Sequence, residues 1–235
     1  LRENPHSLLT KIVGCHAIRM HRMSKNIYFT VMHNVDRKAT CLVNDAVAHC
    51  DLKGNWIGRK TKSIVPLMLA QHIREPSQDT STRTNCKDHD LQVAIAEHGL
   101  RLQLGVEPQV SLTWSAALQE DSRFLAQNNV MDYSLLLIMY RTGPASVSII
   151  DYLQDFNTRK RIEFLFKTVK FRQWPWNEEI NGVSCVYPKT YGLRFAHNLG
   201  RLLESSGTYE KSRDVFELLG EPQCSVSMEV LCDDR

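Results

Sequence analysis

The sequence predicts an α+β fold, because segments typical of strands dominate its first third and amphipathic helices dominate the rest. Its 235 residues, 43% of them hydrophobic, suffice for one large domain or two small ones with a packed core. Lys25–Val31 is rich in β-branched and aromatic residues, and Ile12–Met20 is its candidate antiparallel neighbour. The longest uninterrupted apolar run, Leu135–Tyr140, is far shorter than the roughly 20 residues that a membrane-spanning helix needs.

Turn signals predict the other strands and a loop. A third strand is expected within Cys41–Asp51. Residues 74–87 are rich in Ser, Thr, Asn, Asp and Pro, which predicts a loop insert. Further along, Ser134–Arg141 and Val147–Asp151 predict a β-hairpin that turns at Gly143-Pro144.

Helical periodicity marks the second half of the chain. Apolar residues recur at helical spacing over Ser111–Asn128 and again over Lys189–Glu204. A helix capped by Asn157 or Thr158 is expected between them.

Charge divides the chain into a basic body and an acidic tail. Residues 1–203 carry 26 basic and 18 acidic side chains, whereas residues 204–235 carry 3 and 8. The overall charge of +3 therefore hides a body of +8 and a tail of −5. A basic body indicates an anionic partner such as phosphate, nucleic acid or a membrane surface. The tail has weak periodicity, so little structure is assigned to it.

The seven cysteines give no sign of a metal or disulfide framework. Their number is odd and none of them forms a CxxC pair. Reduced thiols in a cytoplasmic protein are the simplest interpretation.

Asp132 and Asp151 stand where predicted strands begin and end. Asp132 follows a helix and precedes an apolar strand, and Asp151 ends the next strand. A hairpin between them would bring the two carboxylates together. Phosphoryl transfer needs such a pair, one to orient or deprotonate the attacking hydroxyl and one to hold Mg²⁺ on the ATP phosphates. The alternative, which spacing alone favours, is that both residues simply terminate strands.

Three segments resemble the signature of the phosphatidylinositol phosphate kinases: DLKG at 51–54, MDYSLL at 131–136 and IID at 149–151. MDYSLL together with DLKG is specific to that family. The resemblance covers residues 4 to about 200. The flanking segments agree with it, and they are NPxSLL at 4–9, KDHD at 87–90, KRIEFLFK at 160–167 and PxxYxxRF at 188–195.

The resemblance implies a two-lobed α+β kinase-like fold with antiparallel sheets and a catalytic core within residues 1–203. In the family, a Gly-rich loop and an ATP-binding strand lysine precede the NPxSLL segment, where this sequence starts. The expectation is therefore a truncated N-terminal lobe. Such a lobe exposes sheet edges, which leaves a homo-oligomer open as a partner.

Site roles also follow from the resemblance. Asp132 would accept the proton of an inositol hydroxyl, Asp151 would bind Mg²⁺ and ATP, and Asp51 and Lys53 would line the active site. A lysine there suits charge stabilisation on the transferred phosphoryl group. With ATP and Mg²⁺ as cofactors, the reaction implied is transfer of the γ-phosphate to a phosphatidylinositol monophosphate, by default the 4-phosphate, giving the 4,5-bisphosphate. Asn55 stands where serine is usual.

Basic residues and tryptophans follow Asp151. Because the implied substrate is an anionic lipid, they are expected to dock on a phosphoinositide membrane from the cytoplasmic side, at the plasma membrane or endomembranes. An evenly weighted alternative is a solvated basic helix edge with buried tryptophans. The residues concerned are Arg159, Lys160, Arg161, Lys167, Lys170, Arg172, Trp174 and Trp176.

Two other functions compete with the lipid kinase. One is a truncated or inactive kinase-like module that binds anionic phosphoinositide membranes without catalysis, because no GxGxxG phosphate cradle occurs among the eleven glycines. The other, a nucleic-acid binder, is much weaker because the sequence contains no recognisable nucleic-acid motif. No nucleic-acid partner is therefore expected.

Overall fold

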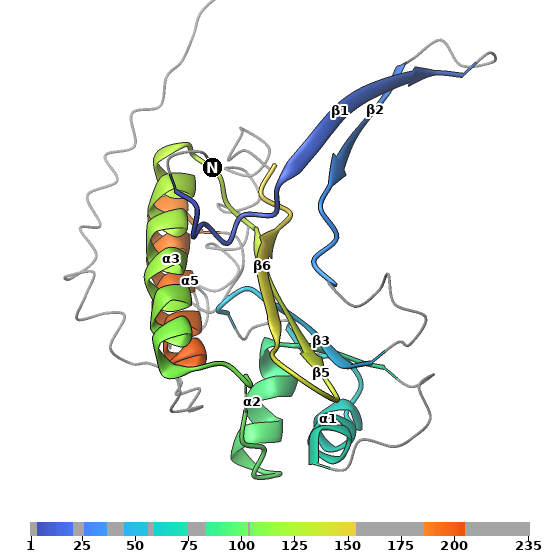
Figure 1. The fold of residues 1–235 in the computed structure, drawn as a ribbon, viewed down its shortest axis with the longest axis vertical. Helices are drawn as coiled ribbons and strands as arrows, with labels where there is room; N and C mark the ends of the chain where they lie inside the picture. The colour runs from blue at the N-terminus through green and yellow to red at the C-terminus, as the bar shows by residue number, and fades with distance from the viewer. Residues whose placement is uncertain are drawn as a thin grey trace, which may run out of the picture.

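The structure, a computed structural model, confirms the α+β class (Figure 1). It describes residues 4–20, 26–36, 45–55, 59–74, 83–102, 104–153 and 186–204. The helix expected from Asn157 or Thr158 and nearly all of the acidic tail lie outside these ranges. Two sheets are present, one of two strands and one of four.

A four-stranded sheet in the order β4-β3-β5-β6 forms the centre of the fold. The predicted hairpin is confirmed, because β5 pairs antiparallel with both β3 and β6. The side chains of β5 are mostly buried, which explains its continuous apolar run. The strands are β3 (Ala46–Leu52), β4 (Thr84–Lys87), β5 (Ser134–Tyr140) and β6 (Ser146–Ile150).

The prediction of a loop insert over residues 74–87 is wrong for its last four residues, because Thr84–Lys87 form β4. This strand runs parallel to β3, so the sheet is mixed rather than antiparallel throughout. Parallel neighbours need a crossover connection, and helix α1 (Val65–Arg74) lies between the two strands in the chain. The polar sequence TNCK does not predict a strand, and its pairing with the distant β3 stabilises it as one.

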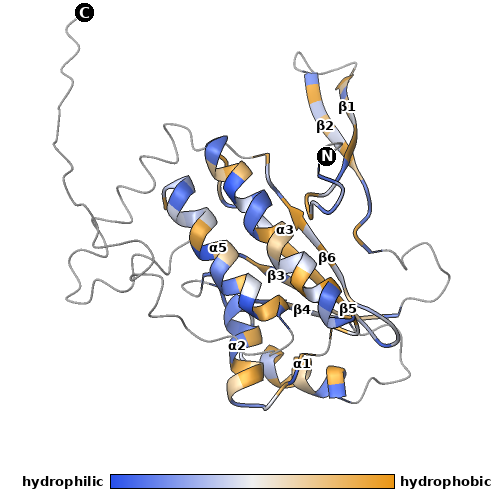
Figure 2. Ribbon diagram, turned by 60° about the vertical axis from the view of Figure 1, so that its left-hand side comes forward, coloured by the Kyte–Doolittle hydropathy of each residue, from blue (hydrophilic) through white to orange (hydrophobic). Residues whose placement is uncertain are grey.

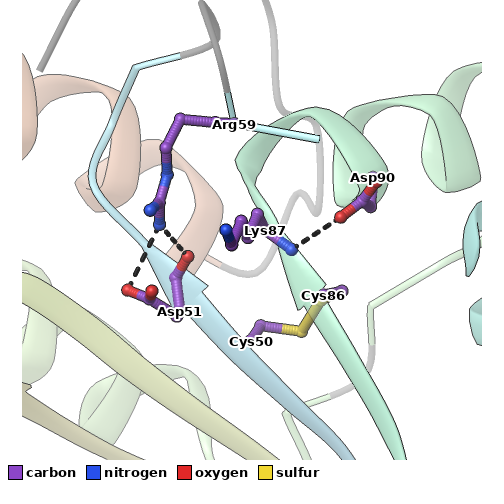
Figure 3. Close-up of a disulfide and its surroundings, with 6 residues drawn as sticks. All are labelled: Cys50, Asp51, Arg59, Cys86, Lys87 and Asp90. Carbon is purple, nitrogen blue, oxygen red and sulfur yellow. Dashed lines mark hydrogen bonds and ion pairs between the residues drawn. A yellow bond between two sulfur atoms is a disulfide. The ribbon is translucent and has the colours of Figure 1, made fainter. Parts of the chain in front are cut away.

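Reduced thiols are also the wrong expectation for Cys50 and Cys86, which form a disulfide between β3 and β4 (Figure 3). The two residues are direct partners in the parallel register, with Cα atoms 4.7 Å apart. They are separated by 36 residues in sequence. The spacing of the two cysteines in the sequence did not indicate this disulfide, because only the parallel pairing of β3 and β4 brings them together.

Two long helices, α3 (Pro108–Gln127) and α5 (Pro188–Leu203), lie side by side next to the sheet (Figures 1 and 2). Both predicted helices are confirmed, and each begins at a proline, which suits the first helical position. Helix α2 (Asp88–Ala96) packs with α1 against β3 and β4. In the described ranges, no helix has the length and apolar character needed to cross a membrane.

The predicted N-terminal hairpin is confirmed as β1 (Ile12–Arg19) paired antiparallel with β2 (Asn26–Met32). It projects from the body of the molecule (Figure 1) and leaves apolar side chains exposed, including Val13 and Tyr28. The segment before β1 joins the central sheet, because the Ile149 N–H donates to the Leu8 carbonyl at 2.7 Å. Self-association through the hairpin stays a prediction.

The disulfide gives a test of the β3–β4 pairing. A cross-link that closes 36 residues should stabilise the fold by about 3–4 kcal/mol. We therefore expect a thiol reductant to lower the melting temperature of the chain by roughly 10 °C. In a variant with both Cys50→Ala and Cys86→Ala, the melting temperature should no longer respond to reductant. Equal responses in the two proteins, or full alkylation of all seven cysteines in unreduced protein, would contradict the pairing.

Candidate active site

One end of the central sheet brings together the DLKG, MDYSLL and IID segments. We call this end of the strands the catalytic edge of the sheet. At the end of β3, Leu52 pairs with Leu135, and at the start of β5, Ser134 pairs with Ile150. Lys53, Asp132 and Asp151 lie one or two residues beyond these pairs. The three side chains therefore leave the sheet at the same edge.

Lys53 and Asp132 form a direct ion pair at this edge. The Lys53 Nζ lies 2.7 Å from Asp132 Oδ1 and donates a second hydrogen bond to the Asp132 carbonyl at 2.6 Å. The side chains are only 15% and 18% exposed, so solvent screens the pair less than it would screen a surface ion pair. The arrangement places a fixed positive charge beside the carboxylate predicted to act on the substrate hydroxyl.

Asp132, predicted to be catalytic, and Asp151, predicted to bind metal, share an uncommon backbone conformation. Asp132 has a φ of 66° and Asp151 a φ of 60°, and within the described ranges Asn129 is the one other non-glycine residue with a positive φ. Such residues cost free energy and persist where the surrounding structure fixes them, which occurs often at functional sites. The backbone thus supports a functional rather than a strand-terminating interpretation of both residues.

An aromatic cluster fixes the backbone after Asp132. Tyr133 is fully buried, and its ring meets Tyr191 and Phe195 edge to face at centroid distances of 4.8 and 4.7 Å. The Tyr191 hydroxyl donates to the Tyr133 carbonyl. Burial raises the pKa of Tyr133, because the phenolate would lose its solvation in the protein interior. Helix α5, which carries the PxxYxxRF segment, therefore supports the loop that holds Asp132.

Asp88, at the start of α2, organises the DLKG turn. Its carboxylate is fully buried and accepts the backbone N–H groups of Lys53 at 3.0 Å and Gly54 at 2.8 Å. It also accepts a hydrogen bond from Arg59 Nε at 2.9 Å. Burial raises the pKa of Asp88, and Arg59 and the two N–H groups offset part of that rise. Asp88 thereby fixes the backbone from which Lys53 reaches Asp132.

Gly54 is required in this turn by its backbone and its neighbours. Its φ is +66°, and a Cβ there would lie 3.0 Å from the Cα of Phe195. Its carbonyl accepts a hydrogen bond from Asn198 Nδ2 at 2.8 Å. The glycine of DLKG thus lets α5 approach the turn closely.

Asp51 contacts Arg59 rather than the Lys53–Asp132 pair (Figure 3). Arg59 donates to the Asp51 carbonyl, and its guanidinium lies 3.2 Å from Asp51 Oδ1. Burial lowers the pKa of Arg59, but the Asp88 and Asp51 carboxylates outweigh it and raise the pKa overall. Arg59 therefore stays charged and links Asp51 to Asp88.

Sequence reasoning missed Asp88 and Arg59 as site residues. Asp88 belongs to KDHD, a segment that resembles the family, so that resemblance was an available signal. Arg59 gave no signal, because it meets Asp51 and Asp88 only through the folded chain. Lys87 lies beside this network, and its N–H donates to Asp90 Oδ2 at 2.9 Å, which supports the first turn of α2 (Figure 3).

Carboxylate oxygens at this edge suit Mg²⁺, which takes few protein ligands and completes its shell with phosphate and water oxygens. Asp151 is exposed, as such a role requires. Within the described part of the chain, no group of three or more His, Cys, Asp or Glu side chains could hold a metal ion.

The proposed membrane-contacting residues lie outside the described residues. Their roles therefore stay predictions. They are Arg159, Lys160, Arg161, Lys167, Lys170, Arg172, Trp174 and Trp176.

Comparisons with known proteins support the family resemblance that these segments indicated. The sequence model of the family described as Phosphatidylinositol-4-phosphate 5-Kinase matches residues 1–147 and 144–201. A phosphatidylinositol 4-phosphate 5-kinase of Plasmodium falciparum (isolate 3D7) is 26% identical over 250 residues, which cover 83% of this chain and 13% of that protein. The human phosphatidylinositol 4-phosphate 5-kinase-like protein 1 is 31% identical over 156 residues, covering 62% of this chain and 32% of that protein.

The chain therefore spans less than a third of the length of each of these two relatives. The family match nevertheless extends over most of the sequence and includes DLKG, MDYSLL and IID. On this match, and with its α+β fold, the chain belongs to the phosphatidylinositol 4-phosphate 5-kinase family.

Proposed function

We propose that this chain carries the phosphate-accepting side of a lipid kinase site, which transfers the ATP γ-phosphate to a phosphatidylinositol monophosphate. The 4-phosphate lipid, giving the 4,5-bisphosphate, is the proposed substrate. The observation that carries the proposal is the Lys53–Asp132 pair, at the same sheet edge as Asp151.

In this proposal, Asp132 accepts the hydrogen bond of the inositol hydroxyl and orients its oxygen for attack. The Lys53 ammonium, held 2.7 Å from that carboxylate, would offset the negative charge that gathers on the transferred phosphoryl group. Because Asp88 fixes the backbone of Lys53 and the aromatic cluster fixes that of Asp132, both groups are positioned before substrate binds.

Asp151, exposed just after β6, would hold Mg²⁺ at this end of the sheet, which leaves Asp132 to act on the inositol hydroxyl. When bound, Mg²⁺ neutralises charge on the ATP phosphates and aligns them for transfer. The positive φ of Asp151 turns the chain as it leaves β6.

Docking on an anionic membrane by residues 155–176 is part of the proposal, as is a location at the cytoplasmic face. Juxtaposed Lys and Arg are attracted to acidic lipids, and Trp favours the lipid–water boundary. The Cys50–Cys86 disulfide bears on that location, because disulfides are rare in the cytoplasm. A protein at the cytoplasmic face is expected to keep this pair reduced unless the fold protects it. Alkylation of the protein inside cells would report whether the pair is closed there.

The Asp132→Asn variant tests the catalytic proposal. We expect transfer of labelled phosphate from ATP to vesicles containing phosphatidylinositol 4-phosphate to fall by about 10²–10⁴-fold, because the amide cannot accept the hydroxyl proton.

The matched control is Glu107→Gln, which changes an exposed carboxylate before α3 and should leave transfer unchanged. Activity that survives Asp132→Asn would refute the assigned role. Vesicle binding by the unaltered chain without any transfer would support the non-catalytic module instead.

The Asp88→Asn variant tests the support beneath Lys53. Removing the charge leaves the guanidinium of Arg59, 11% exposed, with Asp51 as its one carboxylate partner among the described residues, and we expect a loss of about 1.5–3 kcal/mol in unfolding free energy. Urea denaturation followed by circular dichroism measures it. Asp45→Asn, which changes an exposed acceptor of Thr142, should cost less than about 1 kcal/mol. Equal losses of unfolding free energy in the two variants would show that Asp88 stabilises the fold no more than Asp45 does.

Replacement of both Trp174 and Trp176 by alanine tests membrane docking. We expect several-fold weaker flotation with vesicles containing phosphatidylinositol 4-phosphate, since the interfacial anchor is lost. Trp114→Phe, a change in helix α3, is the control and should float like the unaltered chain. Unchanged flotation of the double variant would favour the alternative in which these tryptophans are buried.

A further inference from the structure

A cavity of about 480 Å³ lies at the opposite end of the central sheet from the candidate active site. The end of α1, the segment after α2 and the turn between β5 and β6 enclose it. In Figure 1 this turn lies near α1, away from the β1–β2 hairpin. Met139 and Tyr140, at the end of β5, line the cavity, whereas Ser134 begins β5 at the catalytic edge. A strand of this length separates the two places by about 20 Å.

Three arginines line this cavity, and no acidic residue is among its lining residues. Arg74 comes from the end of α1, Arg101 from the segment after α2, and Arg141 from the turn after β5. In the part of the chain that the structure describes, none of the three forms an ion pair with a carboxylate. Uncompensated guanidinium groups that share one cavity favour an anionic ligand.

Few side-chain hydrogen bonds join these arginines to the described part of the protein, and Arg74 and Arg101 are exposed to solvent. Arg74 donates one hydrogen bond, to the carbonyl of His98. The Nε of Arg141 is buried and has no hydrogen-bond partner among the described residues. A buried donor without a partner is costly, so a ligand that accepts its hydrogen bond would bind favourably.

Backbone hydrogen bonds hold the walls that carry the arginines. The N–H of Arg141 donates to the Asp45 carbonyl at 2.8 Å, and the N–H of Ala145 donates to the Leu104 carbonyl at 2.8 Å. Gly99 lets the Arg74 guanidinium approach, because a Cβ there would lie 3.2 Å from its Nη2. The cavity is thus formed before any ligand arrives, which reduces the entropic cost of binding.

Two carboxylates lie close to the residues that line the cavity. Asp36 accepts a hydrogen bond from the Tyr140 hydroxyl at 3.0 Å, and Asp45 accepts one from the Thr142 hydroxyl at 2.6 Å. Neither aspartate is a lining residue. The charged side chains among the lining residues are therefore the three arginines.

We propose that this cavity is a second binding site, which takes a small ligand carrying two or more phosphate groups. Guanidinium forks match phosphate oxygens in bidentate geometry. The volume lies within the range of roughly 300–1,000 Å³ that small-molecule sites occupy. Three arginines from three separate segments surround more space than one phosphate fills. The ligand is either a soluble phosphate ester or the headgroup of a phosphorylated lipid, which share this chemistry.

Calorimetric titration of the whole chain with inositol 1,4-bisphosphate tests the proposal. We expect saturable binding that weakens as salt rises, because salt screens the guanidinium charges. In the double variant Arg101→Gln with Arg141→Gln, the dissociation constant for this site should rise roughly tenfold or more, since charge-assisted hydrogen bonds are lost. Arg123→Gln, a change at an exposed position on α3, is the matched control and should bind as the unaltered chain does.

Vesicles identify the source of the ligand. Vesicles containing phosphatidylinositol 4-phosphate that bind less well to the double variant would support the site and assign it to a lipid headgroup. A defect confined to the soluble bisphosphate would support the site and assign it to a free phosphate ester. Binding curves that superimpose for the unaltered chain and the double variant, with matching melting curves, would overturn the proposal. Inositol 1,4-bisphosphate is also the headgroup of the substrate proposed for the kinase site, so the second site is identified by the difference in binding between the unaltered chain and the double variant. A loss of phosphate transfer in Asp132→Asn tests the kinase proposal separately.

Discussion

The buried carboxylate of Asp88 is the constraint on which the candidate active site depends. An isolated buried charge would cost several kcal/mol, so the fold surrounds Asp88 with Arg59 and the N–H groups of Lys53 and Gly54. Satisfying the carboxylate fixes the turn after β3 in one conformation. That conformation directs Lys53 to Asp132. The electrostatic need of one buried group thereby sets the geometry of the proposed chemistry.

The parallel pairing of β3 and β4 explains why Asp88 is in that position. Helix α2 begins at Asp88, directly after β4, so the register of β4 decides where the carboxylate lies. Cys50 pairs with Cys86 and Asp51 with Lys87 in that register. The disulfide and the Asp88 network therefore restrain the same two strands, one through a covalent bond and one through buried hydrogen bonds.

Charged side chains gather at the two opposite ends of the central sheet. At one end, Lys53 pairs with Asp132, and Asp151 follows β6, in the arrangement proposed above for phosphoryl transfer. At the other end, arginines line a cavity without acidic partners. Because β5 runs from one place to the other, the two places belong to one rigid element. A ligand in the arginine cavity would contact β5, the strand that begins just after Asp132.

Elements with strong local patterns, and residues within family-specific segments, could be predicted from the sequence alone. The β1–β2 and β5–β6 hairpins and helices α3 and α5 follow from periodicity and turn residues, and Asp132, Asp151 and Lys53 follow from DLKG, MDYSLL and IID. Only the tertiary structure decided that TNCK is a strand, that Cys50 bonds to Cys86, and that Arg59 joins Asp51 to Asp88. These features depend on contacts between residues far apart in the chain. Local propensity carries no information about such contacts, because the free energy that stabilises them comes from pairing and burial in the folded state.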